Sequence, residues 1–481
     1  MATPRGIDTE LAHNSIGFWR SLAQPVAIQA PVLGAALLTA TMASITGGAG
    51  PLSFLLGIVA GFFLVVIFAE LARHFASAGA VYAYAGLMAG VNFAFVIGWI
   101  YVLMMLAFWG ATLSATADFF NSSLNTASAG AHVPWVIIAI VTWAIVAYLV
   151  SRKIAISTAV LFIIEVVGAA LIIIVGIVVF AKGGYHGDHF GFSQYFSFKG
   201  VSVSSVFLGI VIAFLGFGGF EGAAVFGEEA QKPRQYLPRT MLASLLFSGI
   251  IYTYASWFEN VGFPNSAALA SSPSPLVQVT QTYVNTPIAV ILGFAAVVSA
   301  VSATVGNANA ATRYLYALGR DGFLSRRIAG TEHTQKSPIG ALAVLAIPAL
   351  ILSIAFAGTS PALAFDYVGG AAGFLYSFIY LCISTVCIWY FYRRRQYLYS
   401  LVSVISGVIV GYALWDSLVP APPSPFNILP YIAGGVILLG VIIIASSKSL
   451  RERLRGAPTF RIAAEEGGKT LSSGTVPTQA S

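Results

Sequence analysis

Charged residues are scarce in this chain. Asp, Glu, Lys and Arg make up 9% of its 481 residues, whereas soluble domains carry about 25%. Hydrophobic residues reach 58%, and the mean hydropathy is +0.86. Apolar stretches of about 20 residues recur along the whole chain, each long enough to cross the hydrocarbon layer of a membrane as a helix. The composition therefore excludes a water-soluble domain and predicts an all-α polytopic membrane protein.

Cysteine and histidine are also nearly absent. The two cysteines, Cys382 and Cys387, lie five positions apart on different faces of one predicted helix, which excludes a disulfide framework and a metal-ligand spacing. The six histidines fall in tails, loops or interfaces: His13, His74, His132, His186, His189 and His333. There is no H-E-x-x-H, G-x-S-x-G or P-loop motif. We therefore predict no enzyme activity, no bound metal and no cofactor.

The basic charges lie on one side of the predicted topology. The net charge of +7 would fit a nucleic-acid-binding protein, but its distribution indicates otherwise. We predict twelve membrane spans, at about residues 24–46, 52–72, 91–116, 133–150, 154–181, 203–228, 238–260, 286–314, 339–357, 363–391, 400–418 and 430–447. Of the 24 Lys and Arg residues, only Lys182 and Lys199 fall on the side opposite the tails. This asymmetry places both termini in the cytoplasm of a cell-membrane protein and argues against a nucleic-acid partner.

The predicted organisation has four parts. Residues 1–23 form a cytoplasmic N-terminal segment, and 24–391 form a core of ten helices. Residues 400–447 form two further helices. Residues 448–481 have almost no apolar periodicity, so we predict a disordered cytoplasmic tail.

The first and sixth spans are interrupted. The first contains QAPVLGAA near its middle, where Pro31 lacks an N–H group and Gly34 permits unusual backbone angles. The sixth contains LGFGG, residues 215–219, at comparable depth. Two interrupted spans five apart are typical of a five-plus-five inverted repeat, here 24–181 and 203–391, in which two broken helices meet at the membrane midplane. The alternative for the sixth span is a helix-packing face of small residues, since Gly218 and Gly222 have the required spacing.

Broken helices also suggest a ligand. A break exposes N–H groups with partial positive charge and C=O groups with partial negative charge. In a membrane such backbone is tolerated only around a cavity or ligand. A zwitterion, whose carboxylate binds N–H groups and whose ammonium binds carbonyls, matches both ends, so we predict an α-amino acid as the small-molecule substrate.

Three stretches resemble a known family. They are AELARHFASAGAVYAYAG at 69–86, GFEGAAVFGEEAQKPRQYLPR at 219–239, and TRYLYALGRDGFLS at 312–325. Their G-F-E, acidic pair, spaced P…PR and R-x-x-Y-A-x-x-R-D-G patterns are similar to those of amino acid permeases of the amino acid–polyamine–organocation superfamily. Ala76, Ala80 and Ser325 depart from the family's usual proline, glycine and proline. The resemblance implies the leucine-transporter type of fold, with the last two helices outside the repeat.

The two breaks and the resemblance together give the candidate substrate-binding residues. They are Gln29, Ala30, Pro31, Val32, Gly34, Ala35, Ala36, Tyr101, Phe214, Leu215, Gly216, Phe217, Gly218 and Gly219. Gly34, Ala35 and Ala36 occupy the place of the family's G-x-G, whose N–H groups would hold a substrate carboxylate. Leu215 stands where relatives often place an aromatic gate, a task that Phe214 or Phe217 could perform here. For Tyr101 the alternative is a packed core aromatic.

Four further residues are candidates for coupling or gating: Glu165, Glu221, Ser299 and Ser302. An intramembrane carboxylate is costly and is a functional hypothesis by default, so we predict that Glu165 carries a coupling proton; the alternative is a static hydrogen-bonded carboxyl. Glu221 is predicted to gate the pathway or to cap the second half-helix. The serines either line the ion or substrate path or bond back to the preceding helical turn.

These observations predict a secondary active transporter that moves amino acids by alternating access, with the proton as coupling ion. The alternative is an amino acid, amine or polyamine exchanger or uniporter on the same scaffold, although a cationic substrate would require more carboxylates than Glu165 and Glu221 supply. A non-transporting membrane sensor would leave the paired breaks unexplained.

Overall fold

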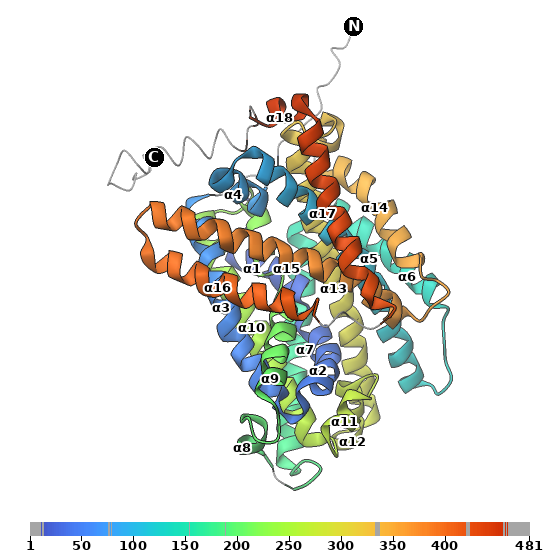
Figure 1. Cartoon of the computed structure of the whole chain (residues 1–481). Helices are drawn as coiled ribbons and strands as arrows, with labels where there is room; N and C mark the ends of the chain where they lie inside the picture. Colours follow the sequence, from blue (N-terminus) through green and yellow to red (C-terminus); the bar gives the residue numbers. More distant parts are fainter. Residues whose placement is uncertain are drawn as a thin grey trace.

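The computed structural model describes residues 11, 14–75, 77, 79–152, 154–187, 189–331, 337–419, 424–455, 457 and 459. Within these ranges the regular structure is helical, and the sole β feature is an isolated bridge between Ile16 and Ala230. The all-α prediction is therefore confirmed. Figure 1 shows α18 and α4 at one end of the molecule, and α8, α11 and α12 at the other. We call these the terminal end and the cap end.

The longer helices follow the predicted spans. They are α1 (Phe18–Gln29), α2 (Pro31–Thr46), α3 (Gly50–His74), α5 (Val91–Ala127), α6 (Trp135–Ser151), α7 (Ile154–Ala181), α9 (Val203–Gly216), α10 (Pro233–Gly262), α13 (Thr286–Arg320), α14 (Ile339–Ile354), α15 (Pro361–Arg393), α16 (Tyr397–Asp416) and α17 (Leu429–Ser446). Each of the twelve predicted segments contains helix.

Shorter helices connect them. They are η1 (Gly47–Ala49), α4 (Ala80–Ala89), α8 (Phe192–Tyr195), η2 (Phe220–Phe226), α11 (Ser266–Ala270), α12 (Pro275–Tyr283), η3 (Arg326–Ala329), η4 (Phe426–Ile428) and α18 (Lys448–Arg455). By length and composition, eight helical stretches of the described chain are apolar enough to cross a membrane. They are Phe18–His74, Val91–Ala127, Val160–Ala181, Pro233–Gly262, Thr286–Arg320, Pro361–Arg393, Tyr397–Asp416 and Phe426–Ser446. The protein is thus a multi-pass membrane protein.

Two long helices form the centre of the bundle. α5 and α13 pack along each other, and α15 and α14 pack against α5. A second group is built on α3, which packs against α10 and α9. The approach of α3 to α9 is close, because a Cβ atom at Gly57 would overlap Ala213. Glycines thus let the helices of this second group come together.

Three predicted boundaries change. α1 begins at Phe18, within the predicted N-terminal segment, and α5 continues to Ala127 instead of ending near 116. The tail predicted to be disordered from 448 begins with α18, whose Leu450 and Leu454 are buried against Phe95. These leucines are four residues apart and share one helix face. This spacing indicates a helix, but it is short and lies within a charged sequence. Residues 456, 458 and 460–481 of that tail, and residues 1–10, 12 and 13 of the predicted N-terminal segment, lie outside the described residues.

Candidate functional site

The first helix break lies at Ala30. α1 ends at Gln29, Ala30 has φ 44° and ψ 68°, and α2 begins at Pro31. Proline disfavours helical geometry in the residue before it and suits the first position of a helix, so Pro31 determines where the break falls. The predicted interruption is present, but one turn earlier than Gly34, and Ala35 and Ala36 lie inside α2.

Gly34 serves close packing instead of unusual backbone angles. It lies within α2, where a Cβ atom would overlap the phenol ring of Tyr252. The Tyr252 hydroxyl in turn donates a hydrogen bond to Gln29 O at 2.6 Å. The free carbonyl at the end of α1 is therefore satisfied by α10, and the absence of a side chain at Gly34 makes room for this contact.

The first N–H groups of α2 are bound by protein side chains. Val32 N–H donates to Glu165 Oε2 of α7 at 3.3 Å, and Leu33 N–H donates to Ser299 Oγ of α13 at 3.0 Å. The N–H of Gly34 is bonded to Ala30 O. Glu165 and Ser299 thus cap the N-terminus of α2, where the helix dipole favours a carboxylate. In this conformation the N–H groups at the first break have partners within the protein.

The second break is longer. α9 ends at Gly216, Gly219 has φ +99°, and the chain continues as the 3-10 segment η2 instead of the expected half-helix. A Cβ atom at Gly219 or Gly222 would overlap the side chain of Ile28, at the end of α1. Glycine is required at Gly219 both for its positive φ and for this close approach. The two breaks therefore lie against each other.

Gln29 joins the two breaks. Its Nε2 donates to Phe217 O at 2.7 Å, and its Oε1 accepts from Ser248 Oγ at 2.8 Å. The side chain, which is 5% exposed, satisfies a carbonyl that the second break leaves free. The ring of Phe217 stacks on Tyr252 at 5.7 Å. One glutamine thus ties the end of α1 to the end of α9.

Glu221 lies in a ring of tyrosines. Its carboxylate accepts hydrogen bonds from Tyr101 of α5 at 2.8 Å, and from Tyr376 and Tyr380 of α15 at 2.8 and 2.6 Å. The side chain is fully buried. Tyr376 also accepts the N–H of Gly219. Three helical segments therefore meet at one buried carboxylate, with hydroxyl donors in place of a cation.

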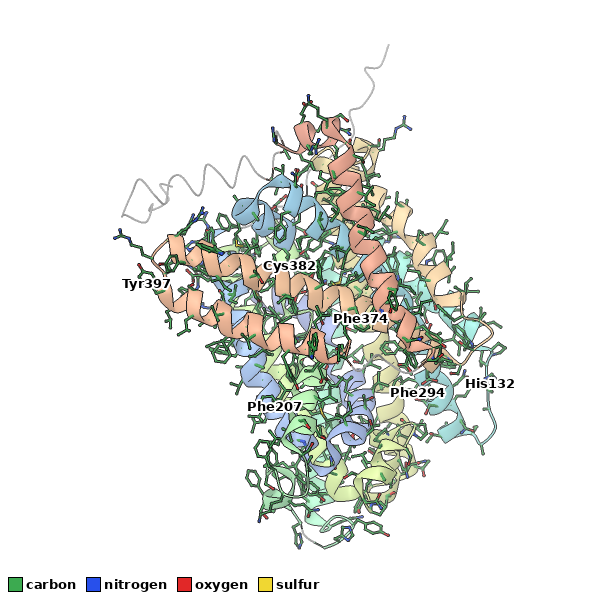
Figure 2. The ribbon with its side chains drawn as sticks, in the orientation of Figure 1. His132, Phe207, Phe294, Phe374, Cys382 and Tyr397 are labelled. Carbon is green, nitrogen blue, oxygen red and sulfur yellow. The ribbon has the colours of Figure 1, made fainter. Side chains whose placement is uncertain are left out.

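A cavity of about 440 Å³ lies beside both breaks. Its wall includes six predicted residues: Gln29, Ala30, Gly34, Gly216, Gly218 and Gly219. The wall is mostly apolar, with Leu33, Met105 and Phe108 among its members, and Figure 2 labels a further one, Phe374 of α15, in the middle of the molecule. Such a wall with few polar groups is typical of a small-molecule site.

Asp366 and Asn307 are polar residues of the cavity wall that were not predicted as ligands. Among the described residues, Asp366 is the only charged one that lines it, and its exposure shows that the cavity reaches the surface there. Asn307 is 3% exposed, and its Oδ1 has no hydrogen-bond partner among the described residues. An unpaired acceptor in a buried wall is costly unless a ligand or water fills it. The feature of the sequence that could have identified Asp366 is its position, as a carboxylate, at the start of an apolar run.

The other predicted residues lie behind the cavity wall. Pro31, Val32, Ala35, Ala36, Tyr101, Phe214, Phe217, Glu165, Glu221, Ser299 and Ser302 are not among the residues that line it. Tyr101 stacks on Tyr314 and binds Glu221, while Ser302 is buried with its hydroxyl unpaired in the described part of the chain. The side chain of Leu215 is outside the described residues. Sequence reasoning missed Tyr376 and Tyr380, whose i, i+4 spacing within one apolar helix was the available signal.

Two ion pairs lie toward the terminal end. Arg313 binds both carboxylate oxygens of Glu229 at 2.8 and 3.0 Å, and both side chains are buried. Arg320 binds Glu228 in the same two-pronged manner. These residues belong to the acidic pair and to the R-x-x-Y-A-x-x-R-D-G pattern found in the sequence. Bidentate pairs of this kind fix orientation as well as charge, so they hold the segment after η2 against α13.

Asp321 follows directly after α13. It accepts a hydrogen bond from Thr459 N–H at 3.4 Å, and Thr459 Oγ1 accepts one from Arg320. Burial raises the pKa of Asp321, although Thr459 and Arg320 oppose the shift. The chain near its C-terminus thus contacts the ion pair at the terminal end.

An apolar helical bundle with two interrupted helices beside a cavity has the architecture of a small-molecule permease. The comparison with known families agrees: the model of the amino acid permease family matches residues 16–446. The chain belongs to this family.

Individual relatives are more distant. The branched-chain amino acid permease BcaP of Lactococcus lactis subsp. cremoris is 25% identical over 370 residues, which cover 72% of this chain and 76% of the relative. The low-affinity putrescine importer PlaP of Escherichia coli K12 is 24% identical over 352 residues, 68% of this chain and 73% of the relative. The methylthioribose transporter of Bacillus subtilis is 25% identical over 336 residues, which cover 64% of this chain and 68% of the relative. The relatives thus carry chemically different small molecules.

Proposed function

We propose that this protein is a secondary active transporter that moves amino acids by alternating access. The observation that carries the proposal is the cavity of about 440 Å³ whose wall contains residues of both helix breaks. The volume lies within the range of about 300–1,000 Å³ common for ligand sites. Membership of the amino acid permease family supports the same class of function.

The proposed topology has twelve spans, a five-plus-five inverted repeat and both termini in the cytoplasm. It is supported by the helix in each predicted segment and by the breaks in the first and sixth. With this topology the terminal end is cytoplasmic, and the start of α15, where Asp366 reaches the surface, faces outward. The cavity then opens to the outside.

The inner side is closed in this arrangement. The Glu221 ring of tyrosines and the Arg313–Glu229 and Arg320–Glu228 pairs lie between the cavity and the terminal end. They join η2 and its following loop to α5, α13 and α15. We propose that these contacts separate when the protein opens inward, so that Glu221 acts as a gate.

The proposed substrate is a neutral amino acid with an apolar side chain. The wall offers apolar surface for the side chain of such a substrate. Asn307 Oδ1, which has no partner among the described residues, can accept a hydrogen bond from the ammonium group. The N–H of Gly218 makes no hydrogen bond to a described residue and can donate one to the carboxylate. The branched-chain permease among the relatives supports this assignment.

A diamine is the second candidate. Asp366 supplies a carboxylate in the cavity wall, none of the described residues of that wall is basic, and one relative is a putrescine importer. Asp366→Asn separates the candidates. A diamine carrier should lose tenfold or more in apparent affinity, because a charge-assisted hydrogen bond contributes about 1.5–3 kcal/mol. A neutral amino acid carrier should change little.

The experiment is uptake into proteoliposomes loaded with buffer. A panel of radiolabelled neutral, basic and acidic amino acids and putrescine is tested with and without an inward proton gradient. We expect accumulation of a neutral apolar amino acid that depends on the gradient. Uptake that requires internal substrate, whatever the pH, would establish an exchanger, and binding without accumulation would contradict transport.

Glu165 is the proposed proton carrier of the first break. Its proton exchange would alter the cap on Val32 N–H and thereby the position of α2. Glu165→Gln should weaken the pH dependence of uptake and leave equilibrium substrate binding within about twofold, because Glu165 does not line the cavity. An unchanged pH profile would contradict this role.

A further inference from the structure

A second buried carboxyl group lies near the cap end of α10. The side chain of Glu259 is fully buried, and neither of its carboxylate oxygens has a hydrogen-bond partner among the described residues. Buried polar side chains without partners are rare in native structures, and each requires an explanation. Glu259 contributes to neither the cavity wall nor the Glu221 ring of tyrosines.

The surroundings of Glu259 contain hydroxyl groups. Thr39 of α2 faces it, and the Thr39 hydroxyl donates its own hydrogen to Ala35 O at 3.2 Å. Ser256 lies three positions earlier on the same face of α10, and its buried hydroxyl also has no partner in the described chain. Thr39 therefore keeps free lone pairs and can accept a hydrogen bond from a protonated carboxyl group.

No cation faces Glu259 from the packed elements that the structure describes. α2, α11 and α12 contain no charged residue, and the charged side chain of α7 is Glu165, bound to Val32. Lys182, just after α7, donates its ammonium to Tyr283 O. In the loop that follows, which contacts the end of α10, His186 binds Pro264 O and His189 binds Phe180 O. The charged groups on the other helical elements that pack most closely against α10 are Arg20 on α1, Glu70, Arg73 and His74 on α3, and Glu221 on η2. Those on α1 and α3 lie near the terminal end, and Glu221 is bound by tyrosines.

An ionised Glu259 would be an uncompensated buried charge, which costs many kcal/mol. The carboxyl group must therefore be neutralised by a proton or by a bound metal cation. Hard metal cations take about six or more oxygen ligands, and Thr39 and Ser256 would supply two of them. The described residues also contain no group of three or more His, Cys, Asp or Glu side chains suited to a metal. A proton is the occupant that this site fits.

We propose that Glu259 binds a proton in this conformation and is a second proton site of the transport cycle. Glu165 contacts α2 at Val32, and Glu259 faces the same helix at Thr39, two turns further on. Because both carboxyl groups depend on the position of α2, a movement of α2 changes the surroundings of both. The role in the cycle rests on the proposed proton-coupled transport; the presence of the proton does not.

Infrared difference spectroscopy of the membrane-reconstituted protein tests the proton directly. At pH 7 the wild type should show a carbonyl band of a protonated carboxyl group that Glu259→Gln lacks. Glu452→Gln, a change at an exposed glutamate of α18, is the control and should remove no such band. An identical band in Glu259→Gln would overturn the proposal. If that variant does not fold, Thr39→Val carries the test: the band should move to higher frequency, and an unmoved band overturns the assignment.

Transport tests the second half of the proposal. Glu165→Gln should retain one pH-dependent step of uptake, and the double variant with Glu259→Gln should lose it. If Glu165→Gln alone abolishes all pH dependence, Glu259 has no part in coupling. The infrared band still reports the proton on Glu259 if the transport assignment itself fails, so the two failures can be distinguished.

Discussion

The two helix breaks differ in the groups that lie next to their free backbone atoms. At the first break, Glu165, Ser299 and Tyr252 bind the free backbone groups, and regular α-helix resumes at Pro31. At the second break, three residues separate α9 from a 3-10 segment, and Gly216, Gly218 and Gly219 all line the cavity. A proline restarts a helix at once, whereas several glycines leave the backbone without a preferred path. Both breaks line the cavity, but the N–H groups of the first are capped by protein side chains, whereas the N–H of Gly218 in the second makes no hydrogen bond to a described residue.

The largest expected effect is at the second break. Gly219→Val introduces a β-branched side chain at φ +99° and overlaps Ile28. Strain and overpacking should together cost at least about 3 kcal/mol, so we expect little folded protein after purification. Gly373→Ala, at a cavity-wall glycine with open space around it, is the matched control and should unfold within a few degrees of wild type. Equal yields of both variants would show that the second break tolerates a side chain.

Removal of the charge at Glu221 should have the next largest effect. Glu221→Gln keeps the shape but turns an amide donor toward three hydroxyl donors. We expect a loss of about 1–3 kcal/mol in the free energy of unfolding, against about 1 kcal/mol or less for Glu165→Gln, whose carboxylate accepts a backbone N–H at the long distance of 3.3 Å. Thermal unfolding followed by tryptophan fluorescence measures both. A larger loss for Glu165→Gln would reverse the comparison of the two breaks.

The cap on α2 should have a smaller effect. Ser299→Ala removes the acceptor of Leu33 N–H and should cost about 1 kcal/mol, as for other N-terminal helix caps. Ser302→Ala, one turn along α13 at a buried hydroxyl without a partner in the described chain, should stay within about 0.5 kcal/mol. The same thermal measurement applies, and similar values for the two serines would deny Ser299 a capping role.

The smallest expected effect is a gain in the free energy of unfolding. Ala30 has a positive φ of 44°, so Ala30→Gly should stabilise the protein by about 0.5–1 kcal/mol. Ala36→Gly, inside α2, should instead destabilise it by a similar amount. Ala80, at φ 40°, stands where the resembled family usually has glycine, and Ala80→Gly should behave like Ala30→Gly. A loss of stability in both positive-φ variants would show that these backbone angles are not strained.

Much of the fold could be predicted from the sequence because span length and apolarity are local properties. The predicted segments contain the helices, and the proline and glycine signals marked both breaks. The side chains that bind the free backbone groups of the breaks could not be predicted, because they come from helices that are distant in the sequence. Tyr252 enters beside Gly34, and Tyr376 and Tyr380 reach Glu221 from α15. Nothing local to QAPVLGAA indicates that Glu165 and Ser299 would occupy its N–H groups.

The central claim is that a substrate binds in the cavity beside the two breaks. It is tested most directly by labelling Gly373→Cys, in a background with Cys382→Ser and Cys387→Ser, with a membrane-impermeant thiol reagent added from outside. Gly373 lines the cavity, and Ser128→Cys in the exposed α5–α6 connection is the control. The account predicts that the transported amino acid slows labelling at Gly373→Cys severalfold and leaves the rate at Ser128→Cys unchanged. Equal labelling of Gly373→Cys with and without a saturating transported substrate would contradict it.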